Sequence, residues 1–156
     1  MAFGTFDLFH AGHENYLQQA KNLGDQLMVI IARDETVQKI KGHAPTHNER
    51  ERMKNVKNSG LVDKVILGSK GDKHAVLKKH RPDVIALGYD QHVFTQRLEK
   101  TLIDFKLNAD IVRLEAYFPQ MYKSSLLRKQ AQGEATVPTK ENEEMSILRS
   151  FSTPHK

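Results

Sequence analysis

The sequence predicts an α/β fold with a doubly wound, five-stranded parallel sheet and helices on both of its faces. Two observations carry this prediction. Short apolar runs recur along the chain, and they are continuous rather than alternating, which is typical of strands covered on both faces. Stretches with helical periodicity separate these runs, so that strands and helices alternate through most of the 156 residues.

The expected strands are short, and the first one is the shortest. Strands are predicted at residues 1–3, 26–32, 62–67, 83–87 and 109–114. The first strand is central in this fold, and strands usually have about five or six residues, so a strand this short is expected to cost stability. Two explanations stay open: the chain starts late in the strand, or its true start lies upstream.

Four stretches between these strands carry a helical signal. In the first, apolar residues recur at helical spacing after His13, and Gly24 ends the pattern. The second, at residues 49–58, is strongly charged and follows Thr46, which we expect to cap it. The third and fourth are predicted at residues 73–80 and 93–107.

The composition of the chain changes after residue 130. The segment that follows is polar, has few large apolar residues, and cannot bury enough apolar surface to order itself. We therefore predict one domain over residues 1–130 and a flexible, disordered tail over residues 131–156.

Composition and charge exclude several classes of protein. The chain has no cysteine, which excludes disulfides and thiolate zinc sites. It has neither an apolar run long enough to span a bilayer nor a signal sequence, so we expect a cytoplasmic protein without a membrane partner. The net charge of +5 suits either a nucleic-acid binder or an enzyme of triphosphates. Because the basic residues are scattered and no aromatic residues cluster among them, we expect no nucleic-acid partner.

The most informative stretch connects the first strand to the first helix. Residues 4–13 read Gly-Thr-Phe-Asp-Leu-Phe-His-Ala-Gly-His. A strand–turn–helix connection directs backbone N–H groups and the positive end of a helix dipole at one point, which suits a phosphate. Gly12 permits a close approach of the backbone. His10 and His13 lie one turn apart, so their imidazole N–H groups could bind the same phosphate.

This decapeptide resembles the nucleotidyltransferase superfamily that carries a His-x-Gly-His signature. It is most similar to the cytidylyltransferase-like branch, which includes glycerol-3-phosphate, choline-phosphate and ethanolamine-phosphate cytidylyltransferases and the archaeal-type FAD synthetases. The resemblance implies a Rossmann-like nucleotidyltransferase fold. It also implies direct attack of an acceptor phosphate on the α-phosphorus of a nucleoside triphosphate, with release of pyrophosphate and without a protein nucleophile.

Further segments resemble the motifs of this branch. Lys41 matches a lysine that reaches the triphosphate from a loop, and Arg52 matches the arginine of a Glu-Arg-x-x-x-Val helix. Without the resemblance, a solvated lysine and a surface helix with i,i+4 ion pairs would be the simpler interpretations. Gly88 and Asp90 follow the fourth strand, where ligands bind in doubly wound sheets. A later Ser/Thr-type signature begins at Tyr122, although the residues just before it depart from the branch pattern.

The resemblance assigns roles to individual residues. Asp7 is a candidate partner of the Mg²⁺ ion that would neutralise the triphosphate, and an Asx-turn is an equal alternative for this side chain. The predicted catalytic residues are His10, His13 and Lys41. The predicted nucleotide-binding residues are Gly4, Thr5, Phe6, Gly12, Arg52, Gly88, Asp90, Ser124, Ser125 and Arg128.

Three functions remain open at this point. Residues 86–91, Ala-Leu-Gly-Tyr-Asp-Gln, are worded most like the archaeal-type FAD synthetases, which favours AMP transfer from ATP to FMN. The alternative in the same reaction class is a CTP-dependent cytidylyltransferase that acts on glycerol 3-phosphate or another phospho-alcohol. The third is an inactive nucleotide- or nucleic-acid-binding module, which the intact histidines and Lys41 disfavour. The expected partners are a nucleoside triphosphate and a small phosphorylated acceptor, and the branch suggests a homodimer.

Overall fold

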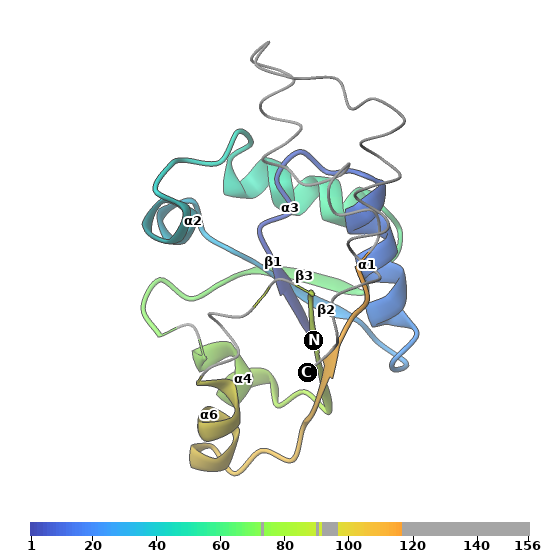
Figure 1. The fold of residues 1–156 in the computed structure, drawn as a ribbon, viewed down its shortest axis with the longest axis vertical. Coiled ribbons are helices and arrows are strands. Elements are labelled where there is room, and N and C mark those ends of the chain that lie inside the picture. The colour runs from blue at the N-terminus through green and yellow to red at the C-terminus, as the bar shows by residue number, and fades with distance from the viewer. Residues whose placement is uncertain (73, 90, 92–96, 117–156) are drawn as a thin grey trace, which may run out of the picture.

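A computed structural model of the chain describes residues 1–72, 74–89, 91 and 97–116, and Figure 1 shows how their elements are arranged. The predicted tail over residues 131–156 lies outside these ranges. The strands are β1 (Ala2–Gly4), β2 (Met28–Ile31), β3 (Lys64–Leu67), β4 (Val84–Leu87) and β5 (Asp110–Arg113). The helices are α1 (Ala11–Lys21), α2 (Asp34–Lys41), α3 (Glu49–Asn58), α4 (Ala75–His80) and α6 (Leu98–Asp104).

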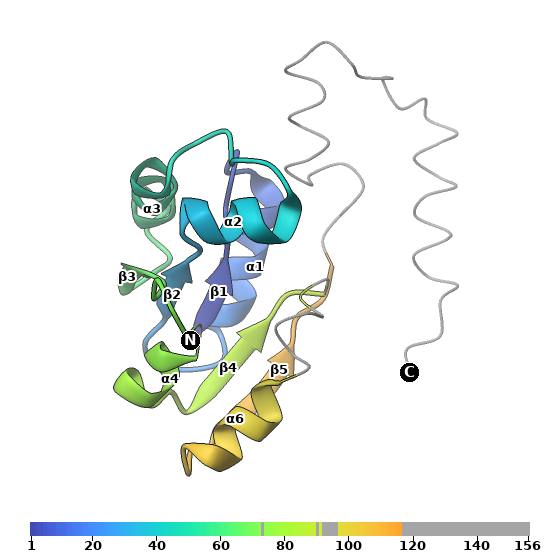
Figure 2. The ribbon, with the colours of Figure 1, turned by 90° about the vertical axis from the view of Figure 1, so that its left-hand side faces the viewer.

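The five strands form one sheet in the order β3-β2-β1-β4-β5, and every pairing is parallel. This confirms the predicted sheet and the central place of β1 (Figure 2). The order reverses at β1, because β2 and β3 lie on one side of it and β4 and β5 on the other. Ligands of doubly wound sheets bind at such a switch point, beyond the carboxyl ends of the strands.

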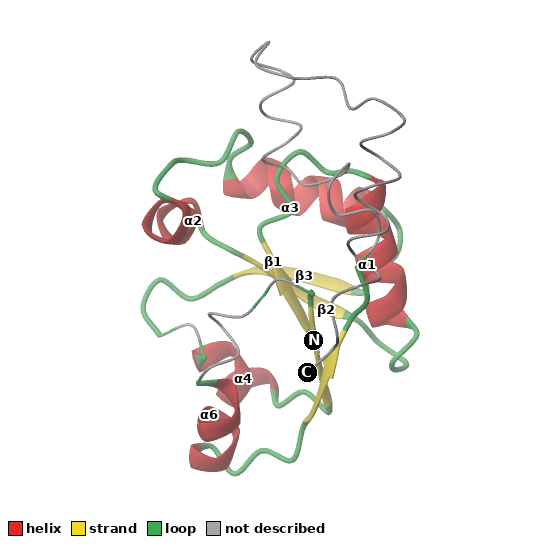
Figure 3. Cartoon of the chain, viewed as in Figure 1, coloured by secondary structure: helices red, strands yellow, loops and turns green. Residues whose placement is uncertain are grey.

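Helices cover both faces of the sheet. Figure 3 shows α1 and α3 on one side of the strands and α4 and α6 on the other. Two groups of buried apolar side chains fill the two interfaces. One joins Leu17 and Val56 to the sheet, and the other joins Leu77 and Leu98 to it. None of the helices within the described ranges is long and apolar enough to cross a membrane.

The first strand is short, as predicted, and the chain terminus extends its pairing. The Met1 ammonium donates a hydrogen bond of 2.7 Å to the carbonyl of Val84. The Met1 carbonyl accepts from the N–H of Ala86 at 2.9 Å. Burial lowers the pKa of this amine, and the nearby charge of Asp83 opposes the shift. The first residue therefore takes part in the ladder although it lies outside the strand itself.

The structure corrects three details of the predicted helices. It adds α2, where we expected a loop that carries Lys41. The cap of α3 is not Thr46 but Asn48, whose side-chain oxygen accepts from the N–H of Glu51 at 2.9 Å. An amide oxygen at this position satisfies one of the N–H groups that a helix start leaves without a partner. The first helix ends at Lys21, two residues earlier than the apolar pattern indicates.

Candidate functional site

The turn after β1 has a strained backbone. Phe6 and Leu8 have φ angles of 53° and 51°, a region that residues with a side chain rarely adopt. The Phe6 ring folds back over Gly4, where a Cβ atom would lie 2.6 Å from the ring. Any larger residue at this position would force the Phe6 ring to move. Such strain persists only where the surroundings enforce it, and it clusters at functional sites.

Phe6 is buried and packs against one of the signature histidines. Its side chain is 3% exposed. Its ring meets the imidazole of His13 edge-on, with the centroids 5.4 Å apart, and it also packs against Tyr16. We predicted Phe6 as a nucleotide-binding residue; that role stays a prediction, while the ring contact shows that Phe6 helps to fix the position of the His13 ring.

The two signature histidines cap the first helix. His10 is the N-cap residue of α1, and its Nδ1 accepts from the N–H of Gly12 at 3.0 Å. The Nδ1 of His13 accepts from the N–H of His10 at 3.3 Å. The pair forms a capping box in which imidazoles replace the usual hydroxyl and carboxylate. The rings stack with a centroid distance of 3.8 Å. The N–H of Gly12 is thus bound to His10.

This geometry fixes the protonation of both rings. A nitrogen that accepts a hydrogen bond carries no proton, so each neutral imidazole has its proton on Nε2. Burial lowers the pKa of His10 to about 4. Burial, the His10 ring and the charge of Lys41 lower the pKa of His13 to about 3, against an opposing effect of Asp7. At neutral pH, the site therefore holds two neutral rings whose only N–H donors are at Nε2.

The low pKa values make the fold sensitive to acid. Free histidine has a pKa of 6.5, so the unfolded chain binds more protons than the folded chain between pH 6.5 and about 3. The free energy of unfolding is therefore expected to fall as the pH is lowered through this window. Urea denaturation at pH 7 and pH 5 measures the change. The double variant His10→Asn/His13→Asn should lose less stability between these pH values, and an equal loss would contradict the assigned pKa shifts.

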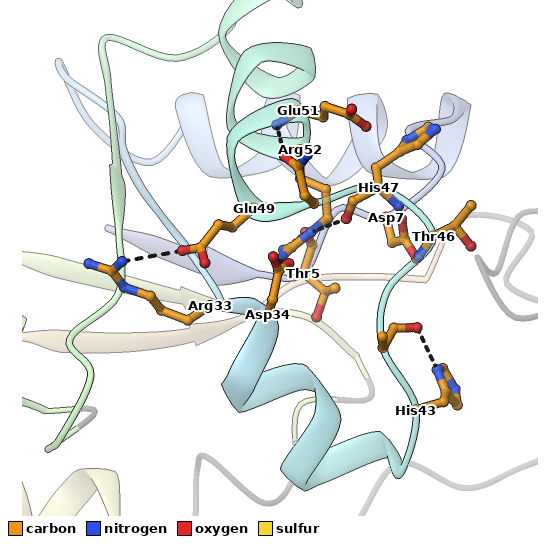
Figure 4. Close-up of polar contacts among 12 residues, drawn as sticks. Thr5, Asp7, Arg33, Asp34, His43, Thr46, His47, Glu49, Glu51 and Arg52 are labelled. Atoms are coloured by element: carbon orange, nitrogen blue, oxygen red, sulfur yellow. Dashed lines mark hydrogen bonds and ion pairs between the residues drawn. The ribbon is translucent and has the colours of Figure 1, made fainter.

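Asp7 lies in the turn between β1 and α1, residues 5–10, which we call the signature turn. It binds the segment between α2 and α3 to this turn. Its side chain is 1% exposed. One carboxylate oxygen accepts from the N–H of Thr46 at 2.7 Å, and the other accepts from the N–H of His47 at 2.9 Å (Figure 4). These partners lie about forty residues away in the chain, so the contact is long-range and not the local Asx-turn that we considered.

Arg52 also joins the signature turn to the segment between α2 and α3, through buried hydrogen bonds. It is fully buried, although the sequence alone suggested a surface helix. Figure 4 shows its side chain reaching from α3 toward the signature turn and the start of α2. It donates to the carbonyl of Thr5 at 2.8 Å, to the carbonyl of His47 at 3.0 Å and to the carboxylate of Asp34 at 2.8 Å. Its contact with a nucleotide stays a prediction, whereas its role in joining these three segments follows from the hydrogen bonds.

Lys41 lies in the last turn of α2, and its side chain is exposed. The helix ends at Gly42, which has a φ of 77° and the left-handed conformation typical of a helix stop. The charge of Lys41 is close enough to contribute to the low pKa of His13. The structure therefore places the Lys41 charge within electrostatic reach of His13, and the catalytic role of Lys41 stays a prediction.

Gly88 lies at the carboxyl end of β4, beside the switch point, and Gln91 and Arg113 bind its backbone groups. Four of the predicted nucleotide-binding residues lie outside the described residues: Asp90, Ser124, Ser125 and Arg128.

A cleft of about 550 Å³ lies between α1 and α3, and its lining includes Leu8 and His47 but none of the predicted catalytic side chains. We assign the site from the chemistry of the histidines and not from this cleft.

The described residues do not form a metal cage. Within the ranges that the structure covers, no three histidine or acidic side chains come together in a way that could hold an ion. The carboxylate of Asp7 is already bound by two backbone N–H groups. These residues do not fit a protein-built Mg²⁺ site.

Sequence reasoning missed Asp34, the carboxylate partner of Arg52. Its position directly after the second strand carries a usable signal, because polar residues at the carboxyl ends of parallel strands gather at one edge. It also missed the capping function of the histidines, although the spacing of three residues is that of a capping box.

Comparisons with known proteins bear on the fold and on the family of the chain. A family model described as cytidylyltransferase-like matches residues 1–130. An FAD synthase of Thermoplasma acidophilum is 40% identical over 129 residues, which cover 83% of this chain and 90% of the relative. An FAD synthase of Methanosarcina barkeri is 48% identical over 114 residues, which cover 73% and 81%. The crystal structure of a protein from Thermoplasma volcanium, titled a lipopolysaccharide core biosynthesis protein, has 38% identity and a TM-score of 0.70, and the match covers 75% of this chain and 95% of that one.

Proposed function

Because the chain belongs to the cytidylyltransferase-like family of nucleotidyltransferases, we propose that it is an FAD synthase, which transfers AMP from ATP to FMN. The observation that carries this proposal is the 40% sequence identity to an FAD synthase, over 90% of the length of that relative. The intact histidine pair at the carboxyl end of β1 supports an active enzyme over an inactive binding module.

The reaction needs no protein nucleophile. A phosphate oxygen of FMN attacks the α-phosphorus of ATP and forms a new P–O bond. The bond between the α-phosphorus and the oxygen that bridges to the β-phosphorus breaks, and pyrophosphate leaves with the electron pair. Negative charge moves to oxygens around the α-phosphorus, so catalysis rests on positioning and on hydrogen-bond donors aimed at those oxygens.

We assign this donor role to the signature histidines. His10 and His13 each carry an Nε2–H group, that of His10 in a buried position, and their low pKa values keep both rings neutral at physiological pH. A neutral donor avoids placing two positive charges in stacked rings at the positive end of a helix dipole. Lys41, exposed in the last turn of α2, adds a positive charge. Mg²⁺ carried by the triphosphate, a homodimer and a cytoplasmic location stay predictions.

Replacing Lys41 by alanine is expected to raise KM for ATP and to lower kcat, because its charge acts on the triphosphate in both the ground state and the transition state. Charge-assisted bonds of this kind correspond to a loss in kcat/KM of roughly 10- to 100-fold. Steady-state kinetics measure it. Lys39→Ala is the matched control, since Lys39 lies on the same helix, is 72% exposed and pairs with Glu35. Unchanged kinetics in Lys41→Ala would show that this ammonium does not reach the triphosphate.

A pyrophosphate-release screen tests the proposed function. ATP and CTP are each combined with FMN, glycerol 3-phosphate, phosphocholine and phosphoethanolamine. The proposal predicts release with ATP and FMN above all other pairs. Release with CTP and a phospho-alcohol would instead establish the cytidylyltransferase alternative, and release with no pair would favour the inactive module.

A further inference from the structure

The sheet opens between β1 and β4 after a single bridge. Ala2 pairs with Ala86, and the Met1 carbonyl accepts from the N–H of Ala86. On its other edge, β1 stays paired with β2 as far as Gly4 and Ile31. The two central strands separate toward their carboxyl ends (Figure 2). The opening therefore belongs to the β1–β4 seam alone.

A regular parallel ladder would continue from this bridge. Since the Met1 carbonyl accepts from Ala86, the next bond along the same edge would run from the N–H of Gly88 to the carbonyl of Phe3. That bond is replaced by two others. The N–H of Gly88 donates to Oε1 of Gln91 at 2.8 Å, and Nε2 of Gln91 donates to the carbonyl of Phe3 at 2.7 Å. The side-chain amide of Gln91 is thus inserted into the ladder as a substitute peptide group.

The surrounding contacts hold this amide in place. The N–H of Gln91 donates to the carbonyl of Gly88 at 3.2 Å, which closes a tight turn and directs the side chain back to the seam. The same Gly88 carbonyl accepts from Arg113 at 2.7 Å. The hydroxyl of Tyr16, on α1, lies 3.0 Å from the Phe3 carbonyl and 3.4 Å from the Ala86 carbonyl. Polar side chains therefore satisfy the backbone groups that the separated strands no longer offer each other.

We propose that Gln91 is a positioning residue, whose side-chain amide holds the carboxyl ends of β1 and β4 apart and keeps open the crevice that takes the nucleotide. Doubly wound sheets bind ligands in the crevice that forms where two neighbouring strands separate at the switch point, beyond their carboxyl ends. Glutamine suits this role because its amide offers both the donor and the acceptor that the two strands need. The inference rests on the proposed function for the identity of the nucleotide, ATP.

The expected result of Gln91→Ala is a closed ladder. The N–H of Gly88 and the carbonyl of Phe3 can then bind each other, so the variant should fold with a melting temperature near that of the wild type. The narrowed crevice should raise KM for ATP about tenfold, with a smaller effect on kcat. Gln91→Met keeps the bulk of the side chain but lacks both polar groups, and it should show the same rise. Gln18→Ala, on the exposed side of α1, is the control and should behave as the wild type.

Crystal structures and kinetics of these variants test the proposal. It is supported if Gln91→Ala brings the Gly88 nitrogen within about 3 Å of the Phe3 oxygen and raises KM. It is overturned if the strands stay apart without the amide, or if KM stays at the wild-type value. A wild type that makes no FAD would refute the proposed function, yet the structure of Gln91→Ala would still decide whether the amide separates the strands. If Gln91→Ala does not fold, the KM of Gln91→Met decides: a wild-type value overturns the proposal.

Discussion

Replacing His10 by asparagine is expected to lower kcat by about 10²–10³-fold while leaving the fold nearly as stable as that of the wild type. Loss of one preorganised donor to developing charge has an effect of this size. The asparagine oxygen can still accept the N–H of Gly12 and cap the helix, as Nδ1 of His10 does at 3.0 Å. It cannot replace the donor at Nε2. The variant therefore separates the capping role of the ring from its proposed catalytic role.

His10→Ala and His13→Ala complete this experiment. Both should lose turnover to a similar degree, and both should also lose about 1 kcal/mol of stability because they remove half of the capping box. His80→Asn is the control, since His80 lies at the end of α4, which packs on the other face of the sheet. Near-normal kcat in His10→Asn would mean that the signature histidines serve the helix start alone.

Replacing Arg52 by leucine is expected to lower the free energy of unfolding by about 2–4 kcal/mol. The guanidinium is fully buried and binds three groups that come from three separate segments. Leucine fills part of the space but leaves the carbonyls of Thr5 and His47 without their donor. The carboxylate of Asp34 is 37% exposed, so water can compensate in part for the lost ion pair. Urea denaturation gives the change in the free energy of unfolding.

Arg50→Leu is the matched control for this substitution. Arg50 lies two residues earlier on the same helix and is exposed, so its loss should change stability by less than about 0.5 kcal/mol. If Arg52→Leu were as stable as this control, the hydrogen bonds of the Arg52 guanidinium would contribute nothing to the stability of the fold. A raised KM for ATP at unchanged stability would instead indicate the direct nucleotide contact that the sequence motif suggests.

The sheet could be predicted from the sequence, because parallel strands buried on both faces leave continuous apolar runs. The helix α2 could not be recognised in the same way. Its eight residues include only two apolar ones, Val37 and Ile40, and only Val37 is buried, so the apolar stripe is too short to recognise. Its end was readable in principle, since Gly42 follows two basic residues, which is typical of a helix stop.

The place of the signature histidines at the start of the first helix could be predicted from sequence, whereas the contacts that support them could not. The burial of Arg52 depends on a carbonyl in the turn after β1, forty-seven residues away. The role of Gln91 depends on a ladder bond that is missing between two strands, and no local pattern reports a missing bond. Motif spacing carries the chemistry of a site, but the contacts that hold the motif in place are long-range.

The fate of the α-phosphate of ATP tests the central claim most directly. The protein is incubated with FMN, Mg²⁺ and ATP labelled with ³²P at the α-position, and the products are separated by chromatography. The account predicts that the label appears in FAD, in a one-to-one ratio with the FMN consumed and the pyrophosphate released. No labelled FAD, together with label transfer from α-labelled CTP to a phospho-alcohol, would contradict it.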